Sequence, residues 1–130
     1  MERSVAGIII RGQKALLAQR GPSGSFEGFW EFPGGKVESG ESDQVALARE
    51  YSEELGLEVR ASRLLGEVTF PHRGVERALA AWLVEAPSFE RLELVEHQAY
   101  LWAGPGEIEK LNLVESDRKI LEFVLPLLKA

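Results

Sequence analysis

The sequence predicts an α/β fold in which a mixed β-sheet packs between helices. Several short runs have the β-branched content or alternation of strands, and two longer segments have the apolar spacing of helices. The chain has 130 residues, which is enough for one domain with a buried core. No repeat, low-complexity segment or shift in composition marks a second domain, so we expect a single domain over residues 1–130.

Six segments have the composition of strands or extended chain. They are residues 4–10, 14–20, 30–32, 57–70, 76–85 and 99–103. The segment Arg11-Gly12-Gln13 is typical of a hairpin turn between the first two, and residues 72–74 are expected to join the two long strands. Residues 21–28 are rich in glycine and serine, and residues 36–41 are polar, so both are expected to be loops.

The main helix is expected between residues 42 and 55. Ser42 or Asp43 is a suitable N-cap, and Gly56 is a suitable C-terminal stop. At about 100° per residue, one side of this helix is shared by small or apolar residues that we expect to face the core. These residues are Val45, Ala48, Ser52 and Leu55. The acidic side of the helix lies nearly opposite and is therefore expected to face a cleft.

The C-terminal segment predicts two further helices. Gly104-Pro105-Gly106 breaks the chain before a short helix over the next five residues. Ser116 or Asp117 is expected to cap a last helix, which Pro126 kinks or ends after about residue 125. The apolar stripe of this helix is Ile120, Leu121, Val124 and Leu128.

Charge and composition exclude several classes of protein. The formal net charge is −6 and lysine and arginine do not cluster, so a nucleic-acid polymer is not an expected partner. No apolar run approaches the roughly 20 residues that span a bilayer, and the first residues have no signal-peptide pattern. The chain has no cysteine, which excludes disulfides and thiolate metal sites and permits a reducing compartment. We expect a cytoplasmic protein without a membrane partner, as a monomer or a dimer.

Three glutamates in the main helix point to metal chemistry. Glu50, Glu53 and Glu54 have i, i+3, i+4 spacing, which places their carboxylates on one helix face within reach of a single ion. Like charges in this arrangement destabilise an isolated helix, and a hard divalent cation with oxygen ligands would relieve the repulsion. A solvated acidic helix face is the alternative interpretation of the same spacing.

The segment from Gly35 to Leu57 resembles the Nudix box, G-x5-E-x7-R-E-U-x-E-E-x-G-U, where U is aliphatic. The matching positions are Gly35, Glu41, Arg49, Glu50, Glu53, Glu54, Gly56 and Leu57. Tyr51 departs from the pattern at the first U position, where we expect a packing adjustment without loss of chemistry. The resemblance implies an α/β/α sandwich and the hydrolysis of a phosphoanhydride bond.

The resemblance also implies a site built around Mg²⁺, or Mn²⁺ in its place. The ligands would come from the helix and from the glycine turn before it, namely Glu50, Glu53, Glu54, Gly34 and Gly35. One glutamate would take the proton from the attacking water, with Glu50 and Glu53 as the candidates, and Arg49 would orient a glutamate. A surface ion pair is the alternative for Arg49, and a tight turn without a ligand role is the alternative for the glycines.

Two further stretches resemble the MutT-type and CTP-pyrophosphohydrolase-type branch of the family. Glu96 lies six residues before Trp102, which implies a further metal ligand or base, whereas an ordinary loop carboxylate is the alternative. His97 is expected to be a surface or loop histidine. The sequence WEFPGGK over residues 30–36 implies a set of substrate-binding residues, which comprises Arg20, Glu31, Phe32, Lys36 and Asp117.

Each substrate-binding assignment has a structural alternative. The alternatives are a solvated strand end for Arg20, a core position for Phe32 and a lone exposed side chain for Lys36. Asp117 is expected either to read the base or to cap the last helix, and one carboxylate oxygen cannot do both. An ionised aspartate only accepts hydrogen bonds, which suits the amine of cytosine or the N–H groups of guanine and 8-oxoguanine.

The expected activity is Mg²⁺-dependent hydrolysis of nucleoside triphosphates to the monophosphate and pyrophosphate. Oxidised nucleotides such as 8-oxo-dGTP are the first expected substrates, closely followed by CTP, dCTP and their analogues. ADP-ribose and dinucleoside polyphosphates are alternative substrates. A nucleotide-binding module without catalysis is a further alternative, and the intact acidic positions of the box argue against it.

Overall fold

The computed structural model describes residues 1–22, 24–89 and 92–129. Its largest element is a mixed sheet in which β1 runs parallel to β7, while the other neighbouring strands are antiparallel. In spatial order its strands are β5 (Gly34–Lys36), β1 (Glu2–Ile8), β7 (Val75–Glu85) and β6 (Arg60–His72). The predicted pairing of the two long strands across the turn after His72 is therefore confirmed.

A second, antiparallel sheet lies beside the mixed one. Its strands are β2 (Ile10–Arg11), β3 (Lys14–Arg20), β4 (Trp30–Glu31) and β8 (His97–Ala103). The hairpin between β2 and β3 is as predicted. The expected strand over residues 4–10 is instead divided at Ile9, so that its two parts belong to different sheets. The chain crosses between the sheets again at Phe32 and Pro33, immediately before β5.

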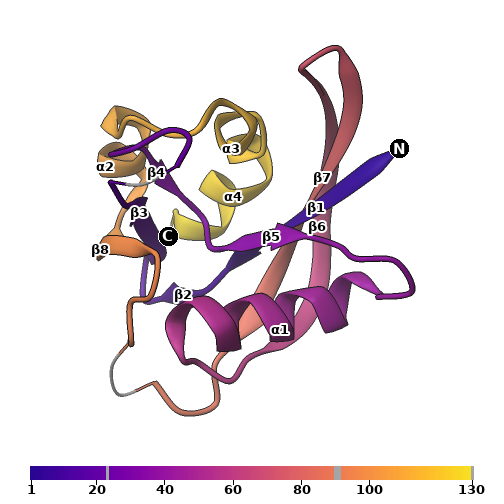
Figure 1. Ribbon diagram of the computed structural model, residues 1–130. Helices are drawn as coiled ribbons and strands as arrows, with labels where there is room; N and C mark the ends of the chain where they lie inside the picture. Colours follow the sequence, from indigo (N-terminus) through magenta and orange to yellow (C-terminus); the bar gives the residue numbers. More distant parts are fainter. Residues whose placement is uncertain (23, 90–91, 130) are drawn as a thin grey trace.

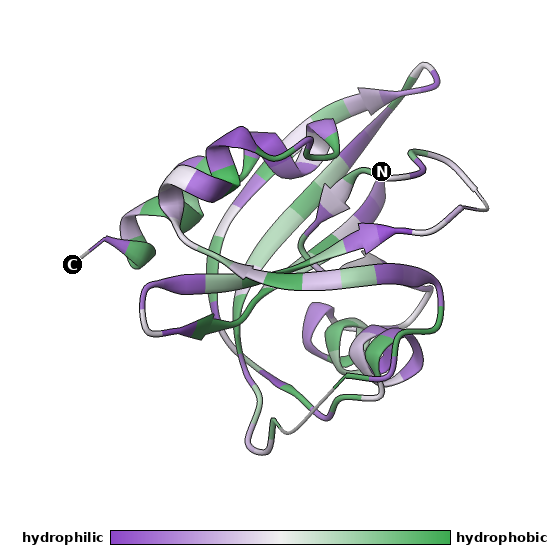
Figure 2. Cartoon of the chain, turned by 90° about the vertical axis from the view of Figure 1, so that its left-hand side faces the viewer, coloured by the Kyte–Doolittle hydropathy of each residue, from purple (hydrophilic) through white to green (hydrophobic). Residues whose placement is uncertain are grey.

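Helices cover both faces of the mixed sheet, which confirms the α/β class with a sheet between helices (Figure 1). One face packs against α1 (Asp43–Leu55), and the other packs against α4 (Leu121–Leu128) near α2 (Pro105–Lys110) and α3 (Glu115–Lys119). Hydrophobic and hydrophilic residues alternate around the helices, as expected for helices with one face on a sheet (Figure 2). In the described part of the chain, no helix is long and apolar enough to cross a membrane.

The ends of α1 follow local sequence chemistry. The Ser42 side chain accepts a hydrogen bond from the Val45 backbone N–H at 3.1 Å, and Gly56 adopts the left-handed conformation that ends the helix. The expected core face is wrong except at Leu55, because Val45 is 54% exposed and Ala48 and Ser52 are also exposed. The buried residues are Ala46, Leu47, Tyr51 and Leu55.

Large side chains decide which face of α1 is buried. Leu47, Tyr51 and Leu55 follow i, i+4 spacing and fill the space above the sheet, and the Tyr51 hydroxyl donates a hydrogen bond to the Gly7 carbonyl at 2.8 Å. Glu50 and Glu54 therefore lie beside this buried face and do not lie opposite it. Tyr51, the departure from the family pattern, is a fully buried core residue.

The expected last helix is two helices. Ile120 breaks the segment with φ −91° and ψ 0°, which separates α3 from α4. Val114 is the N-cap residue of α3 and makes no side-chain cap bond, so the predicted cap at Ser116 or Asp117 is wrong. Asp117 is instead turned toward the interior, where it is 6% exposed. Pro126 does not end α4, which continues to Leu128.

Replacement of Tyr51 by phenylalanine tests the buried hydrogen bond between α1 and β1. We expect Tyr51→Phe to lower the free energy of unfolding by about 1 kcal/mol, because the Gly7 carbonyl loses its buried donor. Urea denaturation measures this change. Tyr100→Phe is the matched control, since Tyr100 is 39% exposed and should have no measurable effect. Equal stability of the two variants would show that the Tyr51 bond contributes no net free energy.

Candidate active site

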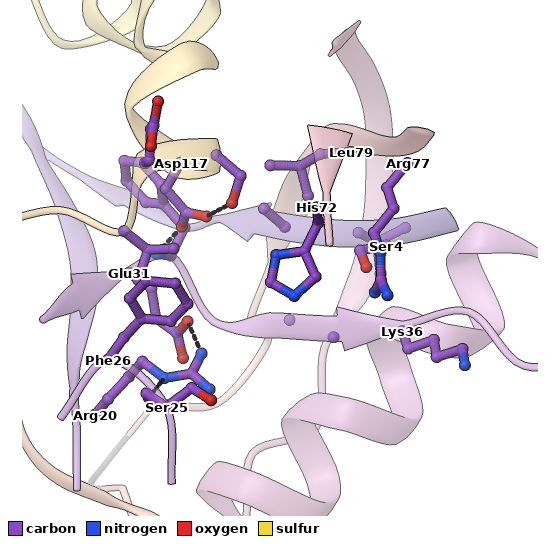
Figure 3. A pocket seen from close by; sticks show the side chains of 18 of the residues that line it. Ser4, Arg20, Ser25, Phe26, Glu31, Lys36, His72, Arg77, Leu79 and Asp117 are labelled. Carbon is purple, nitrogen blue, oxygen red and sulfur yellow. Dashed lines mark hydrogen bonds and ion pairs between the residues drawn. The ribbon is translucent and has the colours of Figure 1, made fainter. Parts of the chain in front are cut away.

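A cavity of about 690 Å³ lies where the two sheets meet α1 and α3. Its walls come from β1, β5, β6 and β7 of the mixed sheet, from β3 and β4 of the small sheet, and from the two helices. Figure 3 shows two groups of polar side chains around it, one near Asp117 and the other near Arg77. The segments that form this cavity are distant in sequence, so the tertiary fold assembles it.

Gly34 and Gly35 lie in strand β5 and do not form the expected tight turn, and their lack of side chains allows α1 to approach this edge of the mixed sheet. A Cβ atom on Gly35 would lie 2.5 Å from the Glu50 carboxylate carbon, and one on Gly34 would collide with the Val5 carbonyl oxygen. Any side chain at either position would therefore displace its neighbour. Gly35 therefore allows the Glu50 carboxylate to lie against β5, and Gly34 allows β5 to lie close to β1.

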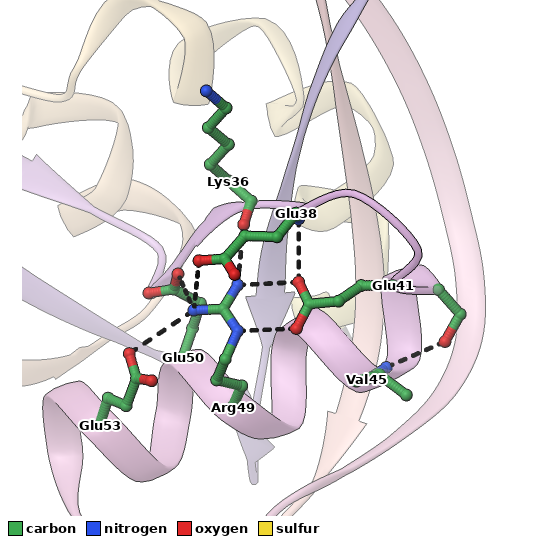
Figure 4. Close-up of polar contacts among 8 residues, drawn as sticks. Lys36, Glu38, Glu41, Val45, Arg49, Glu50 and Glu53 are labelled. Atoms are coloured by element: carbon green, nitrogen blue, oxygen red, sulfur yellow. Dashed lines mark hydrogen bonds and ion pairs between the residues drawn. The ribbon is translucent and has the colours of Figure 1, made fainter.

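Arg49 connects α1 to the end of β5 and to the loop that follows it (Figure 4). Its Nε and Nη2 atoms donate to both Glu41 oxygens, at 2.7 and 2.9 Å. Its Nη1 donates to Glu50 Oε1 at 2.9 Å and lies 3.5 Å from Glu53 Oε2, and its Nη2 donates to the Lys36 carbonyl. The hydrogen bonds from Arg49 lower the pKa of Glu41 to about 2. A single guanidinium thus holds Glu41 and Glu50 in place.

The Glu54 carboxylate lies among other carboxylates, in a negatively charged environment. Burial, followed by the charge of Glu50 and then of Glu31 and Glu96, raises its pKa to about 9. Its Oε2 atom is buried and has no hydrogen-bond partner among the described residues. A buried carboxylate oxygen beside a second carboxylate is the donor set that a hard divalent cation accepts. The residues present therefore fit a metal ion at Glu50 and Glu54.

The three helix glutamates are not equivalent. Glu50 and Glu54 line the cavity, whereas the Glu53 side chain is 61% exposed and lies near Arg49. Glu96 is exposed at the cavity edge, at the end of the loop that precedes β8. Among the described residues, no group of three or more histidine, aspartate or glutamate side chains is arranged to hold a metal ion.

Glu31 occupies the opposite wall with both carboxylate oxygens engaged. Oε1 accepts a hydrogen bond from Arg20 Nη1, and Oε2 shares a hydrogen bond with His97 Nε2, each at 2.8 Å. His97 was expected at the surface, but its side chain is only 4% exposed. The signal in the sequence was the alternation of β8, which begins at His97 and not at Ala99, so that His97 points inward.

Asp117 lies on the wall that α3 contributes. Its Oδ2 accepts a hydrogen bond from the Phe32 backbone N–H at 2.8 Å, and Ser116 Oγ lies 3.4 Å from its Oδ1. Burial, with a further contribution from the charge of Glu31, raises the pKa of Asp117 to about 8. The Phe32 side chain lines the cavity but belongs to the buried core, at 2% exposure.

Several cavity residues have no motif that would identify them in the sequence. Lys36, by contrast, was expected here, and it lies at the cavity edge with its Nζ 2.6 Å from Glu2 Oε1. The unexpected lining residues include Ser4, Phe26, Phe70, His72, Arg77 and Leu79. Phe26 comes from the loop between β3 and β4, whereas strand pairing within the mixed sheet brings the other five together.

Comparisons with known proteins agree with this fold and with the acidic segment. The NUDIX domain family matches residues 1–124. The CTP pyrophosphohydrolase of Escherichia coli is 41% identical over 124 residues, which cover 95% of this chain and 90% of that protein. The 8-oxo-dGTP diphosphatase of Proteus vulgaris is 42% identical over 73 residues, which cover 54% of this chain and 65% of that protein.

A solved structure is similar over nearly the whole length. The solution structure of the E. coli ORF135 protein superposes with a TM-score of 0.85 at 39% identity and covers 98% of this chain and 90% of that one. The resemblance carried by the segment from Gly35 to Leu57 is thereby confirmed. The chain belongs to the NUDIX domain family and is a Nudix hydrolase, an enzyme that splits phosphoanhydride bonds.

Proposed function

We propose that this Nudix hydrolase uses Mg²⁺, or Mn²⁺ in its place, to convert nucleoside triphosphates into the monophosphate and pyrophosphate. Oxidised nucleotides such as 8-oxo-dGTP are the first candidate substrates, closely followed by CTP, dCTP and their analogues. The observation that carries this proposal is the pair of half-buried carboxylates, Glu50 and Glu54, at the edge of a cavity large enough for a nucleotide. The names of the E. coli and P. vulgaris relatives support the two substrate classes.

The proposed metal ligands come from α1, from β5 and from the loop before β8. Glu50 and Glu54 would hold the cation, with Glu53, Glu96 and the backbone carbonyls of Gly34 and Gly35 in β5 as further ligands. Bound there, the cation would neutralise charge on the phosphate oxygens and make a bound water more acidic.

The protein side chains have separate tasks in this reaction. Arg49 keeps the Glu50 carboxylate turned toward β5 through its 2.9 Å contact. Glu50 and Glu53 are the candidates for accepting the proton of the attacking water. Lys36 and Arg20 supply positive charge at the edges of the cavity, where phosphate oxygens would be bound.

Asp117 is the proposed base-reading residue. With a pKa of about 8 it carries a proton at neutral pH, so it can donate as well as accept a hydrogen bond. This proposal replaces the expectation of an ionised group that only accepts hydrogen bonds. Because Oδ2 is engaged by the Phe32 N–H, Oδ1 is the atom that would meet the base. Glu31 and Phe32 would complete this part of the substrate site.

A hydrolysis panel tests the proposal directly. The enzyme is incubated with Mg²⁺ and with 8-oxo-dGTP, dGTP, CTP, dCTP, ADP-ribose or a dinucleoside polyphosphate. We expect a nucleoside triphosphate to be the best substrate and pyrophosphate to be released with it, because the cation held by the carboxylates would bind the inner phosphates. Release of inorganic phosphate from triphosphates, or a clear preference for ADP-ribose or the dinucleotide, would contradict the proposal.

Glu53→Gln separates a catalytic role for Glu53 from that of an exposed surface residue. We expect kcat to fall by about 10²-fold or more at saturating Mg²⁺, because a glutamine can neither accept the proton nor carry the charge. Thermal unfolding should be unchanged, since the side chain is 61% exposed. Glu58→Gln, another exposed position just after α1, is the control and should keep full activity. Unchanged turnover in Glu53→Gln would remove Glu53 from the mechanism.

Asp117→Asn tests base reading while preserving the acceptor for the Phe32 N–H. We expect the ratio of kcat/KM values for 8-oxo-dGTP, dGTP and dCTP to change at least about tenfold, because an amide presents different hydrogen-bonding groups to the base. Equal ratios in the variant and the wild type would exclude Asp117 from base selection.

The same variant supplies a pH control. The folded-state pKa of Asp117, about 8, lies above the unfolded value, so the folded protein holds a proton that the unfolded chain releases. The stability of the wild type relative to Asp117→Asn should therefore fall as pH rises from about 4 to 8. A difference independent of pH would show that Asp117 is ionised in the folded protein.

A further inference from the structure

The end of the cavity near the β6–β7 hairpin carries a group of hydrogen-bond donors. Ser4, Lys36, His72 and Arg77 line this end, and they come from β1, β5, β6 and β7. Figure 3 shows them on the opposite side of the cavity from Arg20, Glu31 and Asp117. We call these four residues the donor cluster.

Strand register explains why the donor cluster forms. Ser4 is paired with Lys36 on one side and with Leu79 on the other, and Glu2 is paired with Arg77. Alternate residues of a strand share a face, so Glu2 and Ser4 lie on the face of β1 that also carries Ala6 toward the cavity. The cluster is therefore built into the mixed sheet.

Arg77 is the member of the cluster with unused hydrogen-bonding capacity. Its side chain is 28% exposed, and its Nη2 forms an ion pair with Glu2 Oε2 at 2.9 Å. Its Nε is buried and has no acceptor among the described residues. A buried N–H group without an acceptor costs folding free energy, so its retention beside a cavity favours a ligand that supplies the acceptor.

Glu2 is shared between two cations of the cluster. Its carboxylate contacts Lys36 Nζ at 2.6 Å with one oxygen and Arg77 Nη2 with the other. The hydrogen bond from Lys36, with smaller contributions from the charges of Arg77 and His72, keeps the pKa of Glu2 below its usual range. One carboxylate thus faces two permanent cations, which leaves an excess of positive charge at this end of the cavity.

We propose that the donor cluster is a second recognition subsite, which binds an oxygen acceptor of the nucleotide and for which Glu2 competes with the substrate. The acceptor is either a carbonyl oxygen of the base or a non-bridging phosphate oxygen, since both suit a guanidinium. This inference rests on the proposed nucleotide hydrolysis. It adds Arg77, His72, Ser4 and Glu2 to the residues that select the substrate.

Two substitutions with opposite expected effects test the subsite. Arg77→Met removes the donors but keeps much of the side-chain volume, and it should raise KM about tenfold with little change in kcat. Glu2→Gln removes the competing charge, and it should lower KM severalfold. Arg60→Met is the matched control, because Arg60 pairs with Glu85 at the other end of β6 and β7 and should leave KM unchanged. Thermal unfolding of each variant checks that it folds.

The choice of substrates identifies the acceptor. Nucleoside triphosphates that differ only in the base, and di- and triphosphates of one base, are compared for the wild type and Arg77→Met. A KM increase that depends on the base places the base carbonyl at Arg77, and one that depends on the number of phosphates places a phosphate there. An increase that is equal for all substrates, with unchanged thermal unfolding, places a phosphate shared by di- and triphosphates at Arg77. An equal increase with a lowered unfolding temperature would overturn the proposal, because it would be a general structural effect.

The remaining outcomes separate the two proposals. If the wild type hydrolyses no nucleotide, the proposed function fails. If the wild type is active and Arg77→Met has an unchanged KM for every substrate, the function stands and the subsite is overturned. A KM that rises in Glu2→Gln would overturn the competition, because Glu2 would then serve to position Arg77.

Discussion

Strand β1 is the constraint on which both cores and the candidate site depend. It lies between β5 and β7 and faces a helical layer on each side, with Ala6 and Ile8 toward α4 and Val5 toward α1. A Cβ atom on Gly7 would lie 2.5 Å from the Tyr51 hydroxyl, so this small residue determines how closely α1 approaches the sheet. Because β5 pairs with β1, the same approach places the Glu50 carboxylate against Gly35 of β5.

Unfavourable electrostatic interactions are concentrated among the carboxyl groups that line the cavity. The pKa values of Glu54 and Asp117 are raised because both groups are buried near other carboxylates. Arg49 offsets part of this charge by binding Glu41 and Glu50 together. Buried acids with raised pKa values are costly for folding, and they are found where a site must bind cations or move protons. The apolar packing on both faces of the sheet allows the fold to tolerate them.

Local chemistry made part of the fold and of the site predictable. Ser42 and Gly56 mark the ends of α1 by their own backbone and side-chain properties, and they do so in the structure. Residues close in sequence, such as Arg49 and Glu50, were expected together and lie together. Prediction failed where packing between residues distant in sequence determines the structure. Tyr51 determined the buried face of α1, and Ile120 divided the last helix although its apolar stripe looked continuous.

The sequence by itself was sufficient to predict the family, the reaction class and the acidic segment. All three depend on spacings within one helix and the segment just before it. The substrate side of the cavity depends on strand register and on the meeting of two sheets. His97 contacts Glu31, Asp117 contacts Phe32 and Arg77 contacts Glu2 across separations that no local pattern records. Only the tertiary structure therefore raised the pKa of Asp117 and placed Arg77 beside the cavity, since burial determines the first and cross-strand neighbours determine the second.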